Sequence, residues 1–256
     1  MLNILIIDSN PKAQNEAFIA NRGAAAGDTY AVALNQCRDD LNITIVAPYD
    51  GESVPPLDQF DGVVFTGSSV PWNTNDARAE PIAEVMRSVF AKGLPTLGSC
   101  NGMQLAASVL GGHCGVSPNG EENGLALGIQ RTVAGQDHPL LKGRTDGYSV
   151  ACVHRDEVTA LPDGAVLLAT NAHSGVQAFA YEKDGVKFWG MQYHPEFDPT
   201  TLGPSLGRGG KVTQDVARDM EVVDRDAAAA SRLGVRPSDM DPKVHMTELT
   251  NWLASL

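Results

Sequence analysis

Two patterns of apolar residues alternate along the first half of the chain. Short continuous apolar runs predict strands over 2–8, 43–47, 62–66 and 94–97, because a strand buried on both faces needs no polar positions. Between 76 and 92, apolar residues recur every three or four positions, which predicts an amphipathic helix that ends at Gly93. Further helices are predicted over 24–37 and 102–110. Strands and helices that alternate through short glycine-rich turns indicate a parallel sheet covered on both faces.

The second half of the chain shows strand patterns with little helix between them. Strands are predicted over 127–133, 165–170, 176–181 and 186–193, and residues 182–185 form a hairpin-type connection between the last two. These strands should extend the sheet and add antiparallel pairs. We therefore expect an α/β fold of three layers, in which a flavodoxin-like, mainly parallel central sheet has helices on both faces and a few extra antiparallel strands.

A long C-terminal segment follows the last predicted strand. Its pattern predicts a glycine-rich mobile loop over 202–210 and helices over 212–231 and 247–256. No linker, internal repeat or block of like charge interrupts the chain. We therefore expect one domain over 1–200, with a C-terminal loop and helical extension over 201–256 that packs on the same domain. Packing or a dimer contact is the simplest role for this extension, and a lid or docking surface is the alternative.

Composition and charge exclude several classes of protein. The 256 residues include 19 Lys and Arg against 31 Asp and Glu, a net charge of −12, which disfavours nucleic acid as a partner. No apolar run reaches the roughly 18–20 residues of a membrane span, and the first residues lack the basic start of a signal peptide. The four cysteines form no CxxC pair, so neither a zinc finger nor a disulfide framework is expected. We expect a cytoplasmic protein with no membrane partner.

The segment 94–104 carries the clearest chemical signal. A buried strand runs into a turn with Gly98 and Gly102 on either side of Cys100, and a helix follows, which is the arrangement of a nucleophile elbow. The elbow residue has a strained backbone, and side chains two positions away would collide, so glycine is needed there. The turn places the sulfur at a helix N-terminus and directs the Asn101 amide at a developing oxyanion. A lone cysteine is more often a small buried apolar residue, but the flanking glycines favour a nucleophile.

A base and a second oxyanion donor follow from two other strand ends. In an extended segment, residues two apart face the same way, so Glu196 can orient the ring of His194 toward a sulfur, and Pro195 keeps His194 extended. The strand before Gly67 and Ser68 ends at the same edge of a parallel sheet as Cys100, so the Gly67 amide can supply the second donor. Taken alone, each of these two elements is more often an ordinary strand end.

Together these motifs resemble the class I, or triad, glutamine amidotransferases. The elbow matches the family pattern G-x-C-x-G-x-Q, and His194 to Glu196 match its H-P-E motif. Weaker matches lie at 122–124 (E-x-G), 137–140 (H-P-L), 154–158 (H-x-D-x-V) and 177–179 (Q-A-F). The match runs from residue 2 to about 196, and it looks closest to the free-standing members that are similar to GMP synthase. Asn101, where the family usually has an aromatic or aliphatic residue, and the long tail depart from the pattern.

The resemblance implies a mechanism and a set of site residues. Cys100 would attack the γ-carboxamide of glutamine, the Gly67 and Asn101 amides would hold the oxyanion, and His194 with Glu196 would move the proton. A γ-glutamyl thioester would form and water would hydrolyse it to glutamate. No cofactor or metal is implied, and the other histidines (His113, His138, His154, His173 and His245) are expected to be structural or at the surface. The substrate-binding residues implied are Ser68, Gln104, Val150, Ala151 and Cys152, together with Ser149, Val153 and Gln177.

Three functions are compatible with these residues. The first is a glutaminase that passes ammonia to a synthase, which would be a separate subunit because the chain has no G-x-x-x-x-G-K-[ST] loop. The alternative is a free-standing hydrolase or peptidase that acts on γ-glutamyl amides or peptides without a partner. The third is a non-catalytic binding protein on the same fold, which the presence of all three triad residues disfavours. A small-molecule substrate is expected in the first two cases, and a homodimer is compatible with each.

Overall fold

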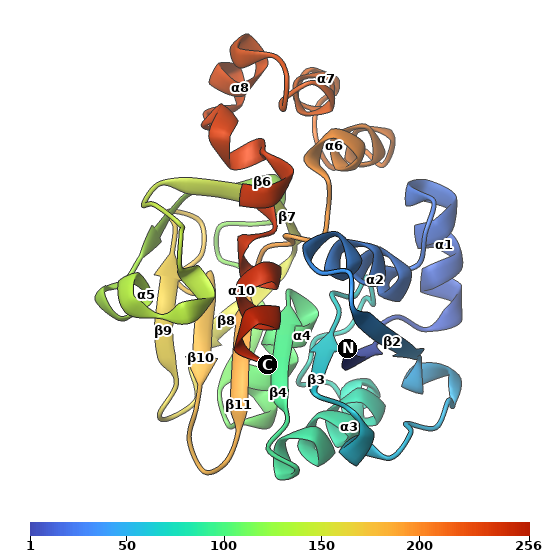
Figure 1. Ribbon diagram of the computed structural model, residues 1–256. Helices are drawn as coiled ribbons and strands as arrows, with labels where there is room; N and C mark the ends of the chain where they lie inside the picture. Colours follow the sequence, from blue (N-terminus) through green and yellow to red (C-terminus); the bar gives the residue numbers. More distant parts are fainter.

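A nine-stranded sheet forms the centre of the computed structural model, which describes residues 1–256 (Figure 1). The strands lie in the order β2-β1-β3-β4-β11-β10-β9-β6-β7, and β5 and β8 pair in a separate small sheet. Their bounds are β1 Leu2–Ile7, β2 Leu41–Val46, β3 Gly62–Phe65, β4 Pro95–Ser99, β5 His113–Val116, β6 Glu122–Arg131, β7 Tyr148–His154, β8 Asp156–Ala160, β9 Val166–Thr170, β10 Ala178–Tyr181 and β11 Lys187–Met191.

The sheet has a parallel half and an antiparallel half. Strands β2, β1, β3, β4 and β11 all pair in parallel, whereas β10, β9, β6 and β7 continue the sheet through antiparallel pairs. The parallel strands are the continuous apolar runs, and residues such as Ile4, Ile6 and Val64 are fully buried. The expected flavodoxin-like α/β fold with additional antiparallel strands is confirmed.

Helices cover both faces of the sheet. Their bounds are α1 Lys12–Arg22, α2 Ala26–Cys37, α3 Glu80–Ala91, α4 Asn101–Val109, α5 Val133–Asp137, α6 Pro199–Arg208, α7 Gln214–Glu221, α8 Ala227–Leu233, α9 Pro242–His245 and α10 Thr247–Ser255. One apolar core packs α2 and α10 on the sheet, with Leu34 and Trp252 against Ile4. A second core packs α3 and α4 on the opposite face, with Met86 and Leu105 against Ile7. No helix is both long and apolar enough to cross a membrane.

The sequence pattern missed several elements. Helix α1 has no buried residue, so it carries no apolar stripe from which a helix can be recognised. Strand β7 is almost entirely buried yet contains Ser149 and His154, and these polar positions break the apolar run. Strand β6 begins at Glu122, five residues before the predicted start at 127, because Glu122 to Gly124, which resemble a turn in the sequence, are part of the strand. Strands β5 and β8 are likewise absent from the prediction.

The glycine-rich segment 202–210, which was expected to be a mobile loop, lies largely within helix α6. Asp198 caps the helix by accepting a hydrogen bond from the Thr200 amide. Gly203 and Gly207 are one helical turn apart and face α7, where a Cβ on Gly207 would lie 2.7 Å from the Ala217 Cβ. The glycines therefore permit close helix–helix packing, and their abundance does not indicate a loop here.

The predicted helix over 212–231 is divided into α7 and α8 by a turn, and Asp226 caps α8 by accepting from the amides of Ala228 and Ala229. The prediction of a helix over 247–256 is confirmed by α10. Helices α6 to α8 gather beyond β6 and β7 (Figure 1), where Leu206 and Met220 share an apolar core with Ala151 of β7. We propose that 201–256 is an extension of a domain over 1–200, because its own apolar cluster includes Leu125 and Ala151 of the sheet and α10 belongs to the core that contains Ile4.

Candidate active site

Cys100 lies in a strained turn between β4 and α4. Its backbone has φ 49° and ψ −107°, a region that costs a residue with a side chain roughly 1–3 kcal/mol. A Cβ on Gly98 would lie 2.7 Å from the Gly102 carbonyl carbon, and a Cβ on Gly102 would collide with the Phe65 carbonyl oxygen. Glycine is therefore required on both sides of the turn, as expected from the sequence. A side chain at either position would collide with backbone atoms rather than with another side chain.

His194 and Glu196 lie next to this turn and are joined by a hydrogen bond. His194 Nδ1 lies 2.6 Å from Glu196 Oε1, and both side chains are buried. A carboxylate accepts hydrogen bonds, so Nδ1 donates to it and Nε2 faces the other way. The ring is held from two sides, because it stacks on Phe197 at a centroid distance of 4.3 Å and a Cβ on Gly67 would lie 2.6 Å from its Cε1.

Charge in this cluster favours the protonated form of His194. Burial by itself would lower the pKa of His194, because it disfavours the charged imidazolium. The negative charge of Glu196 and hydrogen bonds to Cys100 and Glu196 outweigh burial and raise the pKa of His194 to about 10. At neutral pH the ring therefore holds both protons next to the Cys100 sulfur.

These residues line one cavity of about 440 Å³. Cys100 and His194 line this cavity together with Gly67, Asn101 and Gln104. The structure therefore brings together residues that the sequence placed at three separate strand ends. The volume lies within the range of small-molecule sites in proteins. The Cys100 thiol is not part of a disulfide, because all four cysteines are free (Cys37, Cys100, Cys114 and Cys152).

A family model described as class I glutamine amidotransferase matches residues 13–210. The chain belongs to this family. It is 35% identical over 204 residues to a γ-glutamyl-L-1-hydroxyisopropylamide hydrolase of a Pseudomonas species, a match that covers 76% of this chain and 68% of that protein. It is 31% identical over 147 residues to the glutamine-hydrolysing GMP synthase of Ligilactobacillus salivarius, which covers 57% of this chain and 26% of the synthase. The chain thus corresponds to about a quarter of that relative's length.

Solved structures agree with this assignment at the level of the fold. A glutamine amidotransferase from Thermotoga maritima aligns with a TM-score of 0.68 and 20% identity, over 99% of this chain and 97% of that one. A glutamine amidotransferase from Methylobacillus flagellatus aligns with a TM-score of 0.65 and 18% identity, over 100% and 96% of the two chains. The amidotransferase fold therefore extends through the C-terminal helices of this chain.

Part of the substrate-binding prediction for this amidotransferase needs correction. Val150, Ala151 and Cys152 are fully buried in β7 and do not line the cavity, whereas the following residues 153–156 do. The strand runs behind the cavity and only its carboxyl end reaches it, so the prediction lies about three residues too early. Ala151 still supports the site indirectly, because its carbonyl oxygen accepts a hydrogen bond of 2.8 Å from the His194 amide.

Other predicted substrate residues have structural partners. Ser68 and Gln104 both line the cavity. The Ser68 hydroxyl donates to the Ser9 carbonyl oxygen at 2.6 Å, and the Gln104 side-chain amide donates to the Asp156 carbonyl oxygen at 2.7 Å. Ser149 and Gln177 are buried and outside the lining, and the Gln177 amide donates to Glu122 at 2.8 Å. The side chains of Ser68 and Gln104 therefore shape the wall of the cavity, whereas those of Ser149 and Gln177 do not reach it.

One part of the cavity lining was not predicted from the sequence. It includes Phe18 and Arg22 from α1, Trp72 from the loop after β3, and Lys211 from the C-terminal extension. The Arg22 guanidinium lies over the Phe18 ring at 4.5 Å, and its Nη1 is buried without a hydrogen-bond partner. A carboxylate of a ligand would satisfy this group. No motif marks these residues, and α1 itself left no signal in the apolar pattern.

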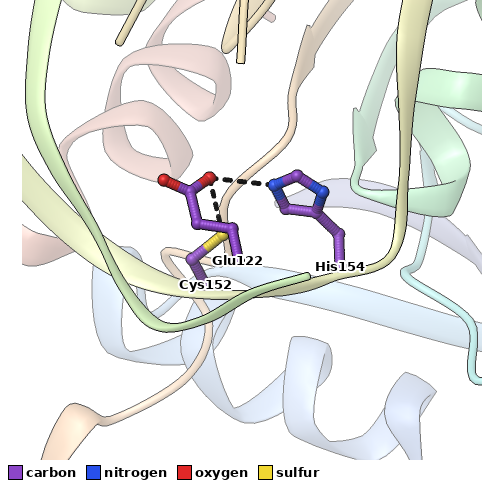
Figure 2. Close-up of side chains that lie close together, drawn as sticks. All are labelled: Glu122, Cys152 and His154. Atoms are coloured by element: carbon purple, nitrogen blue, oxygen red, sulfur yellow. Dashed lines mark hydrogen bonds and ion pairs between the residues drawn. The ribbon is translucent and has the colours of Figure 1, made fainter. Parts of the chain in front are cut away.

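The remaining histidines have different surroundings. His138 caps a short 3₁₀ helix by accepting from the Leu140 amide, and His245 Nε2 donates to the Phe197 carbonyl oxygen at 2.9 Å. His154, in contrast, shares a cluster with Glu122 and Cys152 (Figure 2). Their sequence spacing resembles no metal motif, because the three residues meet only when β6 pairs with β7.

Proposed function

We propose that this protein hydrolyses the γ-amide bond of γ-glutamyl compounds, with Cys100 as the nucleophile. The proposal depends chiefly on one observation: the strained Cys100 and the hydrogen-bonded His194–Glu196 pair line the same cavity. A cysteine in an elbow, a histidine that holds a proton next to it and a carboxylate that orients the histidine form the arrangement of a catalytic triad. Membership of the class I family supports the same assignment.

The reaction proceeds in two halves. The Cys100 thiolate attacks the γ-carbonyl carbon, and the amides of Gly67 and Asn101 stabilise the oxyanion. The C–N bond then breaks, and the His194 imidazolium gives its Nε2 proton to the departing amine, which leaves a γ-glutamyl thioester. His194, now neutral, takes a proton from water as the water attacks the thioester. Glutamate leaves, and Cys100 and His194 return to their starting state.

We favour a substituted amine over ammonia as the leaving group. The relative named as a γ-glutamyl-L-1-hydroxyisopropylamide hydrolase is similar over most of this chain, and its printed substrate carries a hydroxyalkyl amine. The cavity extends from Cys100 to Phe18, Trp72 and Lys211, which leaves space for a group larger than ammonia. The second candidate is a glutaminase that supplies ammonia to a separate synthase, and the GMP synthase relatives favour it.

A substrate comparison with the purified protein alone separates the two candidates. Glutamate release is measured from γ-glutamyl-1-hydroxyisopropylamide, from a γ-glutamyl dipeptide and from glutamine. We expect kcat/KM for at least one substituted amide to exceed that for glutamine by about tenfold, because a larger leaving group gains contacts worth about 1.4 kcal/mol in the cavity. Turnover that is weak and confined to glutamine would contradict this proposal and favour the synthase-coupled enzyme.

The proposed role of His194 predicts a specific pH profile. His194 must be protonated to release the amine, and its pKa is raised to about 10, so kcat/KM should stay high through pH 9 and fall near pH 10. In Glu196→Gln the carboxylate charge that raises this pKa is gone, so the fall should move to lower pH. The measurement is kcat/KM against pH for both proteins, with circular dichroism at each pH to confirm folding. If kcat/KM falls at the same alkaline pH in both proteins, the proposed effect of Glu196 on His194 is contradicted.

A further inference from the structure

Three side chains of types that can bind a metal meet beside the cavity, outside the proposed triad (Figure 2). One ligand atom from each of Glu122, Cys152 and His154 lies within 4.8 Å of the others, and all three residues are buried. Glu122 Oε2 is the central atom: it lies 2.9 Å from His154 Nε2 and 3.6 Å from Cys152 Sγ. Neither the family assignment nor the proposed reaction uses these three side chains as a group.

The pairing of two strands brings the three residues together. In the antiparallel pair of β6 and β7, Glu122 lies opposite His154, and Gly124 lies opposite Cys152. Cys152 and His154 are two residues apart in one strand, so their side chains point to the same side of the sheet. The three ligands therefore stand on a rigid strand pair, which is the support that a metal site requires.

The hydrogen bond on the other nitrogen of His154 directs Nε2 at the cluster. His154 Nδ1 lies 3.0 Å from the Asp156 carbonyl oxygen, which can only accept a hydrogen bond, so Nδ1 carries a proton. Nε2 donates a hydrogen bond to Glu122 Oε2 at 2.9 Å, so its lone pair becomes available to a metal when it gives up this proton. A ligating histidine that donates its other ring N–H to a backbone carbonyl is the usual arrangement around protein-bound metals.

Hydrogen bonds from neighbouring side-chain amides hold the Glu122 carboxylate in place. The Asn171 side-chain amide donates to Glu122 Oε1 at 2.7 Å, and the Gln177 side-chain amide donates to Oε2 at 2.8 Å. These contacts fix the plane of the carboxylate, and the hydrogen bonds that Oε2 accepts from His154 and Cys152 are the ones that a metal would replace. Ligating carboxylates commonly have such outer partners.

The spacing of the ligand atoms is close to that of a tetrahedral zinc site. Zinc bonds of about 2.0–2.3 Å place neighbouring ligands about 3.3–3.8 Å apart in a tetrahedron. The Glu122–Cys152 separation of 3.6 Å fits, and the Glu122–His154 separation of 2.9 Å would open by a few tenths of an ångström. His173 Nδ1 lies 3.9 Å from Glu122 Oε2 and is within reach as a fourth ligand.

We propose that Glu122, Cys152 and His154 form a zinc-type metal site, with His173 or water as the fourth ligand. Zn²⁺ commonly binds a thiolate, an imidazole nitrogen and a carboxylate, which Cys152, His154 and Glu122 provide. On binding, the Cys152 thiol and His154 Nε2 each give a proton to solvent, a bond forms between Zn²⁺ and each ligand atom, and the hydrogen bonds from the thiol and from Nε2 to Glu122 break. His154 and the neighbouring Val153 line the catalytic cavity, so the ion can enter from there.

Metal binding at this place would act on the proposed catalytic residues. The Val153 carbonyl oxygen lies 3.7 Å from Cys100 Sγ, and the Ala151 carbonyl oxygen accepts from the His194 amide at 2.8 Å. Val153 and Ala151 are the immediate neighbours of Cys152 in the chain. A shift of Cys152 and His154 toward the ion therefore moves two carbonyl groups that contact Cys100 and His194, and we expect Zn²⁺ to inhibit turnover.

The decisive experiment uses Co²⁺ as a spectroscopic probe in the Cys100→Ala protein. This background is necessary because Cys100 and His194 are themselves a thiol and an imidazole in one cavity. We expect Co²⁺ to produce a thiolate-to-cobalt charge-transfer band together with the strong visible bands of tetrahedral Co²⁺, and Zn²⁺ to displace it stoichiometrically. The readout needs no catalytic activity, so it is independent of the proposed function. Absence of a thiolate band in folded Cys100→Ala protein would overturn the proposal.

Variants in the same background assign the ligands. Adding Cys152→Ser should abolish the charge-transfer band, and Glu122→Gln or His154→Gln should weaken Zn²⁺ binding at least about 100-fold, beyond the effect of outer contacts. Adding Cys37→Ser should leave the band unchanged, because Cys37 lies in α2 and outside the cluster. A band that survives Cys152→Ser, or that disappears with Cys37→Ser, would overturn the assignment.

Discussion

Replacement of Cys100 by alanine should lower kcat for a γ-glutamyl amide by roughly four to six orders of magnitude, the scale at which removal of a triad nucleophile acts in other hydrolases. The thioester cannot form without the sulfur, and the cavity offers no other thiol, because Cys152 lies behind its wall. Steady-state glutamate release with each protein provides the measurement. Cys37→Ala is the matched control and should retain activity, since Cys37 is a cysteine of α2 outside the cavity.

The loss of activity in Cys100→Ala should occur without loss of the fold. Alanine keeps the Cβ and therefore the same backbone strain at φ 49°, so the melting temperature should change little. In Cys100→Gly the strain is relieved, and this protein should be inactive but more stable than Cys100→Ala by about 1 kcal/mol, after allowance for the extra entropy of glycine in the unfolded chain. Cys100→Gly that melts well below Cys100→Ala would contradict the interpretation of the turn as a strained elbow.

Replacement of Glu248 by alanine should lower the free energy of unfolding by about 3–5 kcal/mol, because it leaves a buried arginine without its counter-ion. Arg144 and Glu248 are almost inaccessible and form two hydrogen bonds of 2.9 and 2.7 Å. Glu248 also accepts from the Tyr193 hydroxyl at 2.8 Å. This network joins α10 to the loop that carries His194, so the C-terminal extension contributes to the support of the proposed site.

Thermal unfolding of Glu248→Ala measures this contribution. For a chain of this size each kcal/mol corresponds to about 2–4 °C, so a loss of about 3–5 kcal/mol should lower the melting temperature by roughly 6–20 °C. Asp219→Ala is the control, since Asp219 pairs with Arg232 at the surface of the same extension and its loss should have little effect. A Glu248→Ala protein that melts within about 2 °C of the wild type would show that the buried pair does not anchor α10.

The parts of the fold and site that the sequence predicted are those set by residues close together in the chain. Gly98 and Gly102 lie two positions from Cys100, and the strain and collisions that they relieve are local. His194 and Glu196 are likewise two residues apart, but a turn closed by the Phe197 amide and the His194 carbonyl oxygen, rather than the expected extended backbone, brings them together. The buried parallel strands were recognisable because burial on both faces demands a continuous apolar run.

The parts that the sequence did not predict depend on long-range pairing. Strand β7 contains Ser149 and His154, and His154 gains its partner Glu122 only when β7 pairs with β6, so the chain from 148 to 154 shows no strand pattern. For the same reason the prediction of Val150, Ala151 and Cys152 as substrate residues lies too early in the strand. The Glu122–Cys152–His154 cluster spans residues about 30 apart that no spacing rule connects. Gly203 and Gly207 indicated a loop until the packing partner α7 was known.

The acyl-enzyme is the most direct test of the central claim that Cys100 attacks a γ-glutamyl amide. The protein is mixed with a γ-glutamyl amide, quenched in acid during turnover, digested and examined by mass spectrometry, beside Cys100→Ala treated in the same way. Our account predicts a peptide containing Cys100 that is heavier by one γ-glutamyl group, sensitive to hydroxylamine and absent from Cys100→Ala. Rapid glutamate release with no adduct on Cys100, or with an adduct on another residue, would contradict it.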